Sequence, residues 1–493
     1  MLIRNPILPG FHPDPAILRV GDDYYIATST FEWHPGVQIH HSRDLAHWRP
    51  LGGALDTQEL LDLRGVPDSG GVWAPDLTYA NGRFHLVFGV VDAYAFGHKD
   101  VTVMLTSAPR IDGPWERPVV VPSRGFDPSL FHDADGTTWL VNMAIDRTPG
   151  SRGFAGVQVQ RLDGTTPVGD PHWIHGLTEH GVTEGPHLYR IGDWYYLLVA
   201  EGGTGWRHGA LVLRSRELLG HYEPDPAGPL ITSRDDPGLA LQKAGHASLV
   251  ATPDGQWFAA HLAARPYGEL GPCVLGRETA LQQVTWVNGW PRIAGARPAV
   301  EVSSPLAAHP WPDQEQPWSG LRRAVAADWV EFGDPIRIRG GQSAYGRRAP
   351  SLLARPISSR TETFAADVTF TTDSPHQSAG ITAFYNSRNW YYLALTADGF
   401  ALTGCDHGRR EVLFHGTGSP RRLELAFDGP VLRFAADGTD LGVTADATVL
   451  SDEHAVEHLG DQVFALGFTG AMVGLWVQDL AHEGCHADFA VAT

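Results

Sequence analysis

The sequence predicts an all-β protein, in which a five-bladed β-propeller is followed by a jelly-roll-like β-sandwich. Three observations support this prediction. One short pattern occurs five times before residue 262, residues 321–493 hold alternating strands without that pattern, and no long stretch shows the apolar period of a helix. A chain of 493 residues is long enough for two such domains.

Each copy of the repeat is a polar residue, a short apolar strand, a turn containing glycine and a strand rich in aromatic or apolar residues. The copies open at Asp14, Asp76, Asp127, Glu184 and His246. These openers lie 62, 51, 57 and 62 residues apart, a spacing that suits a four-stranded blade with its loops. A propeller brings equivalent positions of its blades around one axis. We therefore assign residues 1–295 to the propeller and expect the openers to face one another.

The rest of the chain divides into a linker and a second β domain. Residues 296–320 are rich in proline and alanine, and we interpret them as an ordered linker because their tryptophans should pack. Within residues 321–493, segments such as 364–370, 390–395 and 422–427 alternate or are strand-like, with Asp-Gly turns between others. This pattern predicts the β-sandwich.

Charge and cysteine content narrow the classes of partner and compartment. The chain has 37 basic and 56 acidic residues, which argues against a nucleic-acid partner because phosphate binding needs a basic patch. No stretch approaches 18 apolar residues, and the N-terminus lacks a signal-peptide pattern, so we expect no membrane association. Three scattered cysteines argue against a disulfide framework and for a reducing, cytoplasmic location.

Three of the openers are carboxylates with the chemistry needed for acid–base catalysis. Asp14 and Asp127 each precede a proline, which biases the preceding residue toward an extended backbone. We therefore expect both aspartates to be held extended at a strand entrance. One Asp-Pro pair alone is usually just a turn. Clustered like charges cost energy and rarely persist without a use, so Asp14, Asp127 and Glu184 together indicate a catalytic site.

Seven motifs resemble glycoside hydrolase family 43, and the two-domain β-xylosidase branch most of all. They are residues 5–15, 29–33, 73–77, 125–131, 183–188, 242–248 and 276–279. The resemblance spans essentially the whole chain. It implies an exo-acting, inverting hydrolase that releases terminal xylose from β-1,4-xylo-oligosaccharides. Terminal α-L-arabinofuranose is a second substrate that the resemblance leaves open.

The resemblance assigns a role to each carboxylate. Asp14 corresponds to the general base, Glu184 to the general acid, and Asp127 to the residue that orients Glu184 and raises its pKa. Inversion requires an acid and a base about 6.5–9.5 Å apart, with room for water between them. The assignment is physically sound, because a carboxyl group facing another carboxylate in a closed pocket stays protonated near neutral pH.

The resemblance also implies residues that contact the sugar. Phe31 and Trp73 correspond to pocket walls, and Arg277 to the arginine that hydrogen-bonds the terminal sugar and balances the carboxylates. His246 is expected beneath the sugar, where relatives sometimes hold a water or calcium. We expect no required cofactor, with calcium near His246 as an open alternative. Asp76 is expected to support the backbone near the axis.

Three positions bear on substrate preference. Ile145 stands where relatives usually carry tryptophan, which removes a stacking surface, and His34 replaces an aromatic hydrocarbon ring with a titratable donor. The loop at residues 374–380 resembles one that reaches toward the active site in relatives, with His376 in place of an aromatic residue. We expect this loop to close the pocket and restrict the enzyme to chain ends.

The sequence is also compatible with three other functions. The enzyme could act primarily as an α-L-arabinofuranosidase or on another pentoside. A retaining fructosidase-type hydrolase shares the two-domain fold but carries other motifs and places its carboxyls about 5–5.5 Å apart. A third reading is a carbohydrate-binding propeller without catalysis. The expected partners are xylo-oligosaccharides or arabinose-containing oligosaccharides, and the expected assembly is a homo-oligomer, either a dimer or a tetramer.

Overall fold

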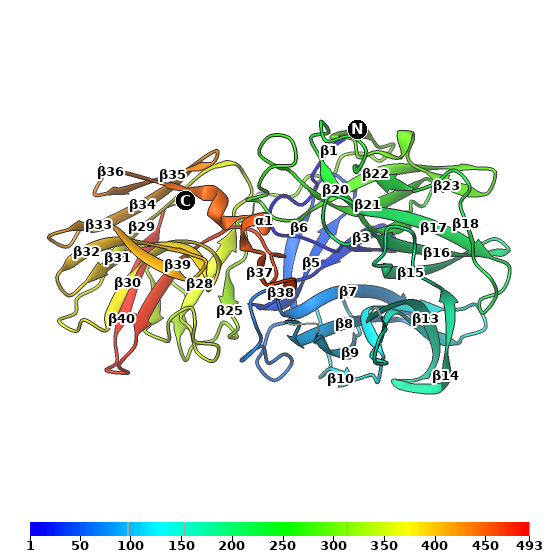
Figure 1. Cartoon of the computed structure of the whole chain (residues 1–493), viewed down its shortest axis with the longest axis horizontal. Coiled ribbons are helices and arrows are strands. Elements are labelled where there is room, and N and C mark those ends of the chain that lie inside the picture. Colours follow the sequence, from blue (N-terminus) through cyan, green and yellow to red (C-terminus); the bar gives the residue numbers. More distant parts are fainter. Residues whose placement is uncertain (96–97, 152, 313, 493) are drawn as a thin grey trace.

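The computed structural model describes residues 1–95, 98–151, 153–312 and 314–492. These residues form two adjoining bodies, with the propeller on the right and the sandwich on the left in Figure 1. Almost all of their regular structure is β-strand, and α1 (Asp452–Ala455) is a single turn of helix between the bodies. No helix in this part of the chain is long and apolar enough to span a membrane. The predicted fold class is confirmed.

Five antiparallel sheets make the blades. Blade one contains β2 (Ala16–Val20), β3 (Asp23–Thr28), β5 (Gly36–Ser42) and β6 (Arg49–Leu55). Blade two contains β7 (Gly71–Ala80), β8 (Arg83–Ala93), β9 (Asp100–Ala108) and β10 (Val119–Val120), and blade three contains β11 (Gly125–His132), β12 (Thr138–Asp146), β13 (Gly153–Asp163) and β14 (Thr166–His175). Blade four contains β15 (Glu184–Ile191), β16 (Trp194–Glu201), β17 (Gly209–Ser215), β18 (Glu223–Pro224) and β19 (Ile231–Thr232), and blade five contains β20 (Gln242–Ala251), β21 (Trp257–Ala264), β22 (Glu278–Val287) and β23 (Trp290–Arg292).

The first strand of every blade lies on the propeller axis. Neighbouring inner strands β2, β7, β11, β15 and β20 contact one another around a closed ring. The N-terminal strand β1 (Leu2–Arg4) pairs with β24 (Glu301–Ser303), which follows the short η1 turn (Ala294–Ala296). The two ends of the propeller sequence are thereby joined beside blade five.

A bulge interrupts the inner strand at or beside four of the five openers. The register shifts fall between Trp73 and Asp76, Phe126 and Ser129, Glu184 and His187, and Gly245 and Ala247. A bulge bends its strand and redirects a side chain without ending the sheet. These irregularities let the polar openers point away from the apolar packing between blades.

Two sheets face each other in the sandwich. The first contains β33 (Arg409–Gly416), β32 (Gly399–Asp406), β31 (Asn389–Thr396), β30 (Gln377–Asn386), β39 (Met472–Asp479), β28 (Leu352–Pro356), β25 (Ser319–Leu321) and β4 (Trp33–His34). The second contains β26 (Val330–Glu331), β27 (Ile336–Arg339), β40 (His486–Val491), β29 (Thr361–Thr369), β34 (Arg422–Asp428), β35 (Val431–Ala436) and β36 (Thr439–Asp446). The turn η2 (Ala447–Leu450) leads into α1, and β37 (Glu457–Leu459) pairs with β38 (Gln462–Ala465).

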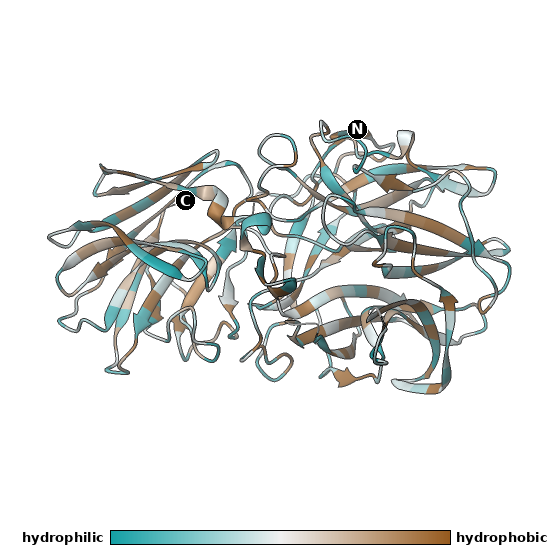
Figure 2. Cartoon of the chain, in the orientation of Figure 1, coloured by the Kyte–Doolittle hydropathy of each residue, from teal (hydrophilic) through white to brown (hydrophobic). Residues whose placement is uncertain are grey.

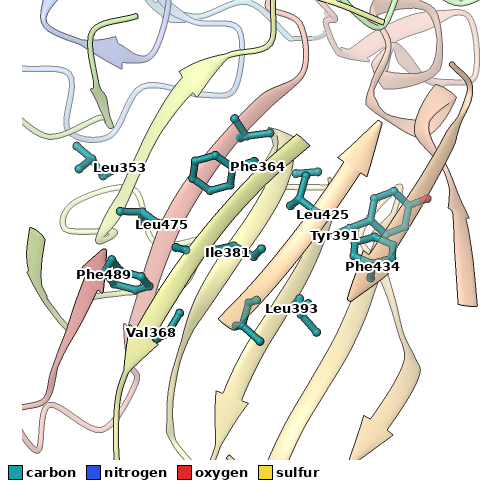
Figure 3. Packing of buried hydrophobic residues seen from close by; sticks show 14 of the residues in the cluster. Leu353, Phe364, Val368, Ile381, Tyr391, Leu393, Leu425, Phe434, Leu475 and Phe489 are labelled. Carbon is teal, nitrogen blue, oxygen red and sulfur yellow. The ribbon is translucent and has the colours of Figure 1, made fainter. Parts of the chain in front are cut away.

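The sandwich core follows from the period-two pattern of its strands. Brown and teal residues alternate along many of these strands in Figure 2, so one face of each sheet is apolar. Leu353, Ile381 and Leu475 from the first sheet meet Phe364 and Leu425 from the second, as Figure 3 shows. These side chains are almost fully buried, and such burial is the main force that holds two sheets together.

Residues 296–312 follow the surface of the propeller, ahead of the strand that enters the sandwich. β24 pairs with β1, and the Trp311 ring lies beneath the Arg49 guanidinium, with 4.0 Å between the guanidinium carbon and the ring centroid. The Trp311 ring also packs on His41 at 5.0 Å. β25 then begins the first sandwich sheet, where it pairs with β4 of the propeller sequence.

A buried ion pair and an aromatic cluster fix the two bodies together. The Arg322 side chain is 1% exposed and donates to Asp68 Oδ1 at 2.5 Å, while Ser387 Oγ donates to Asp68 Oδ2. Nearby, Trp33 packs against Phe384 with ring centroids 5.9 Å apart. A buried charge is tolerated only when it is paired and hydrogen-bonded. Moving the sandwich relative to the propeller would separate Arg322 and Asp68, so these contacts favour one relative placement of the two bodies.

Candidate active site

A cavity of about 210 Å³ opens at the N-terminal ends of the inner strands, where the propeller meets the sandwich. Four of the five openers line it: Asp14, Asp127, Glu184 and His246. The fifth, Asp76, lies deeper along the axis, where it accepts a hydrogen bond from the Leu130 backbone at 2.8 Å. The expected convergence of the openers is therefore found, with Asp76 in a supporting position.

Aromatic rings form the walls of the cavity, and one of them comes from the sandwich. Phe31 and Trp73 line it as expected from the sequence, with centroids 6.2 Å apart. Phe468 from the sandwich packs on both, at 5.8 Å from Phe31 and 5.5 Å from Trp73. Leu466 also reaches the cavity. Such walls suit the C–H faces of a sugar ring, and they need both bodies to be complete.

Asp14 sits in a network that favours its ionised form. Its carboxylate accepts from Ser29 Oγ at 2.7 Å and from Arg277 Nη1 at 3.1 Å, and His246 Nδ1 lies 3.3 Å away. Burial alone would raise the pKa of Asp14, but the Arg277 charge, His246 and Ser29 outweigh it and hold that pKa well below its ordinary value. Asp14 is thus an anion at neutral pH, as a base must be.

The backbone at Asp14 and Asp127 is not extended, and that sequence-based expectation was wrong. Their φ angles are +55° and +50°, in the left-handed region. At Asp127 the β11 bulge overrides the preference that the following proline imposes, and aspartate tolerates positive φ better than most residues. Other cavity residues share this strain: Phe31, Ala74, Val182 and His246. Strained backbone of this kind concentrates where side chains are held for function.

Asp127 acts on Glu184 through a hydrogen bond to the neighbouring backbone and through its charge. Gly185 N donates to Asp127 Oδ2 at 3.0 Å, so Asp127 holds the backbone next to Glu184. Gly185 has φ +55°, and a Cβ there would lie 2.7 Å from His246 Nε2, so only glycine fits. Burial and then the Asp127 charge raise the pKa of Glu184 to about 8. Glu184 therefore carries a proton at neutral pH.

Lys99 is a cavity residue that the sequence did not reveal. Its ammonium lies over the rings of Phe126, Trp73 and Phe154, at 4.1, 4.9 and 5.3 Å from their centroids. Burial lowers the pKa of Lys99, while Glu184 and Asp127 act against that shift. Lys99 lies in a loop outside the repeat, so no pattern pointed to it.

Ile145 and His34 do not line the cavity, contrary to the expectation that they contact the sugar. Ile145 packs behind the aromatic wall, and its cross-strand neighbour Phe154 supplies a ring to the cavity instead. His34 lies in β4, paired with Gly320 of the sandwich. Burial lowers the pKa of His34 to about 4, so it is a neutral residue of the domain interface.

His376 is also far from the cavity. It precedes β30, which runs from Gln377 to Asn386, and it lies in a groove lined by described residues of the sandwich only. The opposite end of β30 is the one near the cavity, where Tyr385 bonds the backbone of Thr469, next to Phe468. At about 3.3 Å per residue, the length of β30 separates His376 from the cavity by roughly 30 Å. Leu466 and Phe468, and not the His376 loop, are the sandwich residues that line the cavity.

Comparison with known proteins agrees with this geometry. The family described as "Glycosyl hydrolases family 43" matches residues 3–291, and the "Beta xylosidase C-terminal Concanavalin A-like domain" matches residues 312–493. The chain belongs to glycoside hydrolase family 43. The resemblance found in the seven motifs is therefore confirmed.

Relatives of this family 43 chain align over almost its whole length. "Xylosidase/arabinosidase 43B" of Humicola insolens is 40% identical and covers 99% of this chain and 96% of its own. "Xylan 1,3-beta-xylosidase" of a Vibrio species is 38% identical, with coverage of 99% and 98%. A crystal structure of "xylan beta-1,4-xylosidase" from Bacillus halodurans C-125 superposes with a TM-score of 0.94 at 40% identity and covers 99% of both chains.

Proposed function

We propose that the protein is an exo-acting, inverting β-xylosidase that removes terminal xylose from β-1,4-xylo-oligosaccharides. The observation that carries the proposal is one aromatic-walled cavity with an ionised Asp14 and a protonated Glu184. Relatives named β-xylosidase or xylosidase/arabinosidase over almost the whole chain support the choice of sugar.

The arrangement supports a single displacement. Asp14 takes a proton from a water molecule as that water attacks the anomeric carbon. Glu184 gives its proton to the departing glycosidic oxygen as the carbon–oxygen bond breaks. The Arg277 guanidinium, which donates to Asp14, keeps that base anionic and directs it. The products are xylose of inverted configuration and a shortened chain. Asp14 then gives its proton to solvent and Glu184 takes one up, which restores both groups for the next cycle.

The sandwich accounts for the exo preference. Leu466 and Phe468 line the same cavity as the propeller carboxylates, so the far wall is closed by a second domain. We infer that this second-domain wall blocks the passage of a sugar chain through the cavity of about 210 Å³. Only a chain end fits, and one terminal residue leaves per cycle.

Activity as an α-L-arabinofuranosidase is the second candidate, because one relative is named for both sugars. Initial rates on 4-nitrophenyl β-D-xylopyranoside and 4-nitrophenyl α-L-arabinofuranoside compare the two directly. We expect the higher kcat/KM on the xyloside, and xylohexaose should at first release xylose and xylopentaose in equal amounts, without xylobiose or xylotriose. A higher kcat/KM on the arabinofuranoside would make that the main activity. No hydrolysis of either would favour a binding propeller.

Substitutions at Asp127 and Lys99 should move the alkaline limb of the pH–rate profile in opposite directions. The Asp127 charge raises the pKa of Glu184 and the Lys99 charge lowers it. Because the active form has Glu184 protonated, Asp127→Asn should shift the fall in kcat/KM to lower pH, and Lys99→Met should shift it to higher pH. Profiles of kcat/KM from pH 5 to 10 would measure both. Shifts of the same sign in the two variants would rule out this electrostatic account.

Truncation of Phe468 tests the contribution of the sandwich to the cavity. Phe468→Ala removes one wall and leaves the carboxylates in place, so we expect KM for xylobiose to rise about 10-fold, with a smaller change in kcat. Phe464→Ala, at an exposed residue of β38 that does not line the cavity, is the matched control. Equal KM values for wild type and Phe468→Ala would mean that the sandwich does not contact substrate.

We propose that the enzyme needs no cofactor, forms a dimer or tetramer and is cytoplasmic. The absence of a required cofactor is supported by a site whose acid and base are both side chains. Calcium takes six to eight oxygen ligands, whereas His246 faces Asp14, whose carboxylate already binds Arg277 and Ser29. Activity that survives dialysis against EDTA is the expected result.

A dimer or tetramer is testable by light scattering, and the three free cysteines suit a cytoplasmic location.

A further inference from the structure

Two histidines and one aspartate meet on the sandwich, away from the active-site cavity. Asp406 and His407 form the tip of the β32–β33 hairpin, and His454 belongs to α1. One potential ligand atom of each lies within 4.8 Å of the other two. His454 Nε2 is 2.6 Å from Asp406 Oδ1, and His407 Nδ1 is 3.9 Å from the same oxygen. The imidazole rings stack with centroids 4.4 Å apart.

The hairpin tip is built rigidly around His407. Its φ is +46° at a turn position where Asn or Gly is usual. His407 N donates to Asn389 Oδ1 at 3.1 Å, and Gly408 N donates to Arg388 O at 2.9 Å. Arg388 Nη2 in turn donates to His407 O at 2.6 Å. A non-glycine residue held in this region by several contacts has its side chain placed by the surrounding structure.

The hydrogen bonding of His407 leaves one ring nitrogen available. Its Nε2 contacts the backbone oxygen of His454 at 2.6 Å, so Nε2 carries the proton and Nδ1 has a free lone pair on the side toward Asp406. Histidine ligands of metals are commonly oriented in this way, with the second ring nitrogen bound to a backbone carbonyl. The Arg388 guanidinium, which donates to His407 O, is compensated by its pair with Glu457.

We propose that Asp406, His407 and His454 bind a divalent first-row transition metal, with Zn²⁺ as the best match. Two imidazoles and a carboxylate are typical zinc ligands, and a tetrahedral ion with bonds of about 2.0–2.1 Å leaves a fourth position for water. Neighbouring ligand atoms of such an ion lie about 3.3 Å apart. To reach that spacing, His454 Nε2 would move about 0.7 Å away from Asp406 Oδ1, and His407 Nδ1 about 0.6 Å toward it. The metal would replace the proton that His454 and Asp406 now share in their hydrogen bond.

The site would clamp a segment that connects the sandwich to the active-site cavity. α1 lies between the two bodies in Figure 1. Its Glu453 pairs with Lys243 of β20, the strand that carries His246, and its Asp452 accepts from the Tyr385 hydroxyl. That hydroxyl also contacts Thr469 N, next to Phe468. A metal that ties His454 to the hairpin would therefore stiffen the contacts that hold Phe468 in the cavity wall.

Zinc titration of the full-length protein tests the proposal. Calorimetry with ZnCl₂ should show one equivalent bound, and His407→Ala and His454→Gln should each weaken that binding at least about 10-fold. Zinc should also raise the Tm of the wild type but not of His454→Gln. Diffraction at the zinc absorption edge should place one anomalous peak between Asp406, His407 and His454.

Matched variants separate this site from other zinc ligands. His458→Gln removes an exposed histidine four residues after His454 and should bind zinc as the wild type does. Cys405→Ser should also keep the binding, which would exclude a thiolate ligand. The proposal is overturned if the wild type binds no zinc at submillimolar concentration. It is overturned equally if His407→Ala and His454→Gln bind as tightly as the wild type, or if the anomalous peak lies elsewhere.

Discussion

Glu184→Gln should lower kcat for xylobiose by about 10³-fold, because general acid catalysis contributes about 10²–10⁴-fold to such reactions. The departing oxygen of a sugar is a poor leaving group without a proton. Nitrophenolate leaves unaided far more easily, so the loss of kcat on 4-nitrophenyl xyloside should be much smaller. The alkaline limb of the pH profile, which reflects the raised pKa of Glu184, should disappear.

Glu179→Gln is the matched control for this substitution. Glu179 is exposed and lies five residues before Glu184 in the same segment, so its loss should leave both rates unchanged. Equal losses on the two substrates in Glu184→Gln would contradict a role in protonating the leaving group. They would indicate instead that Glu184 acts before or independently of bond cleavage.

Asp14→Asn should lower kcat by about 10³–10⁴-fold on xylobiose and on 4-nitrophenyl xyloside alike. The reason is that both substrates need an activated water, whatever the leaving group. The variant also leaves Arg277 and His246 without their anion, so Tm should fall and must be measured to confirm that the protein is folded. Breaking a buried pair in this way costs about 3–5 kcal/mol.

Asp76→Asn provides the comparison for Asp14→Asn. Asp76 is an equally buried opener of the same repeat, but it bonds the Leu130 backbone and does not line the cavity. We expect a loss of stability with little change in kcat. A similar loss of kcat in both variants would mean that the defect comes from the propeller axis and not from the base.

The repeat made the fold and the main carboxylates predictable. Five openers at regular spacing required one axis, and the structure brings Asp14, Asp127, Glu184 and His246 to one cavity. The positive φ of Asp14 was not predictable. Pro15 favours an extended backbone at Asp14, but the structure around the start of β2 overrides that preference. Backbone preferences inferred from sequence are least reliable at functional residues, because the surrounding structure can hold such residues in strained conformations.

Residues contributed by loops and by the second domain escaped prediction. Lys99 and Phe468 lie outside the repeat, and their position depends on contacts between segments far apart in the sequence. His376 was misplaced for a related reason. The loop at residues 374–380 lies in the sandwich, as expected, but it precedes β30 at the end of that strand away from the cavity. The residue pattern of one strand does not show which of its ends lies near the propeller.

The stereochemistry of the released sugar tests the central claim most directly. Proton NMR during hydrolysis of 4-nitrophenyl β-D-xylopyranoside by the wild-type enzyme resolves the two anomers of xylose before they equilibrate, and the cleaved residue is the only source of xylose. With Asp14 as base and Glu184 as acid on opposite sides of the anomeric carbon, α-xylose should appear first and β-xylose only later, by mutarotation. Initial release of β-xylose from the cleaved residue would show retention and contradict the single-displacement mechanism.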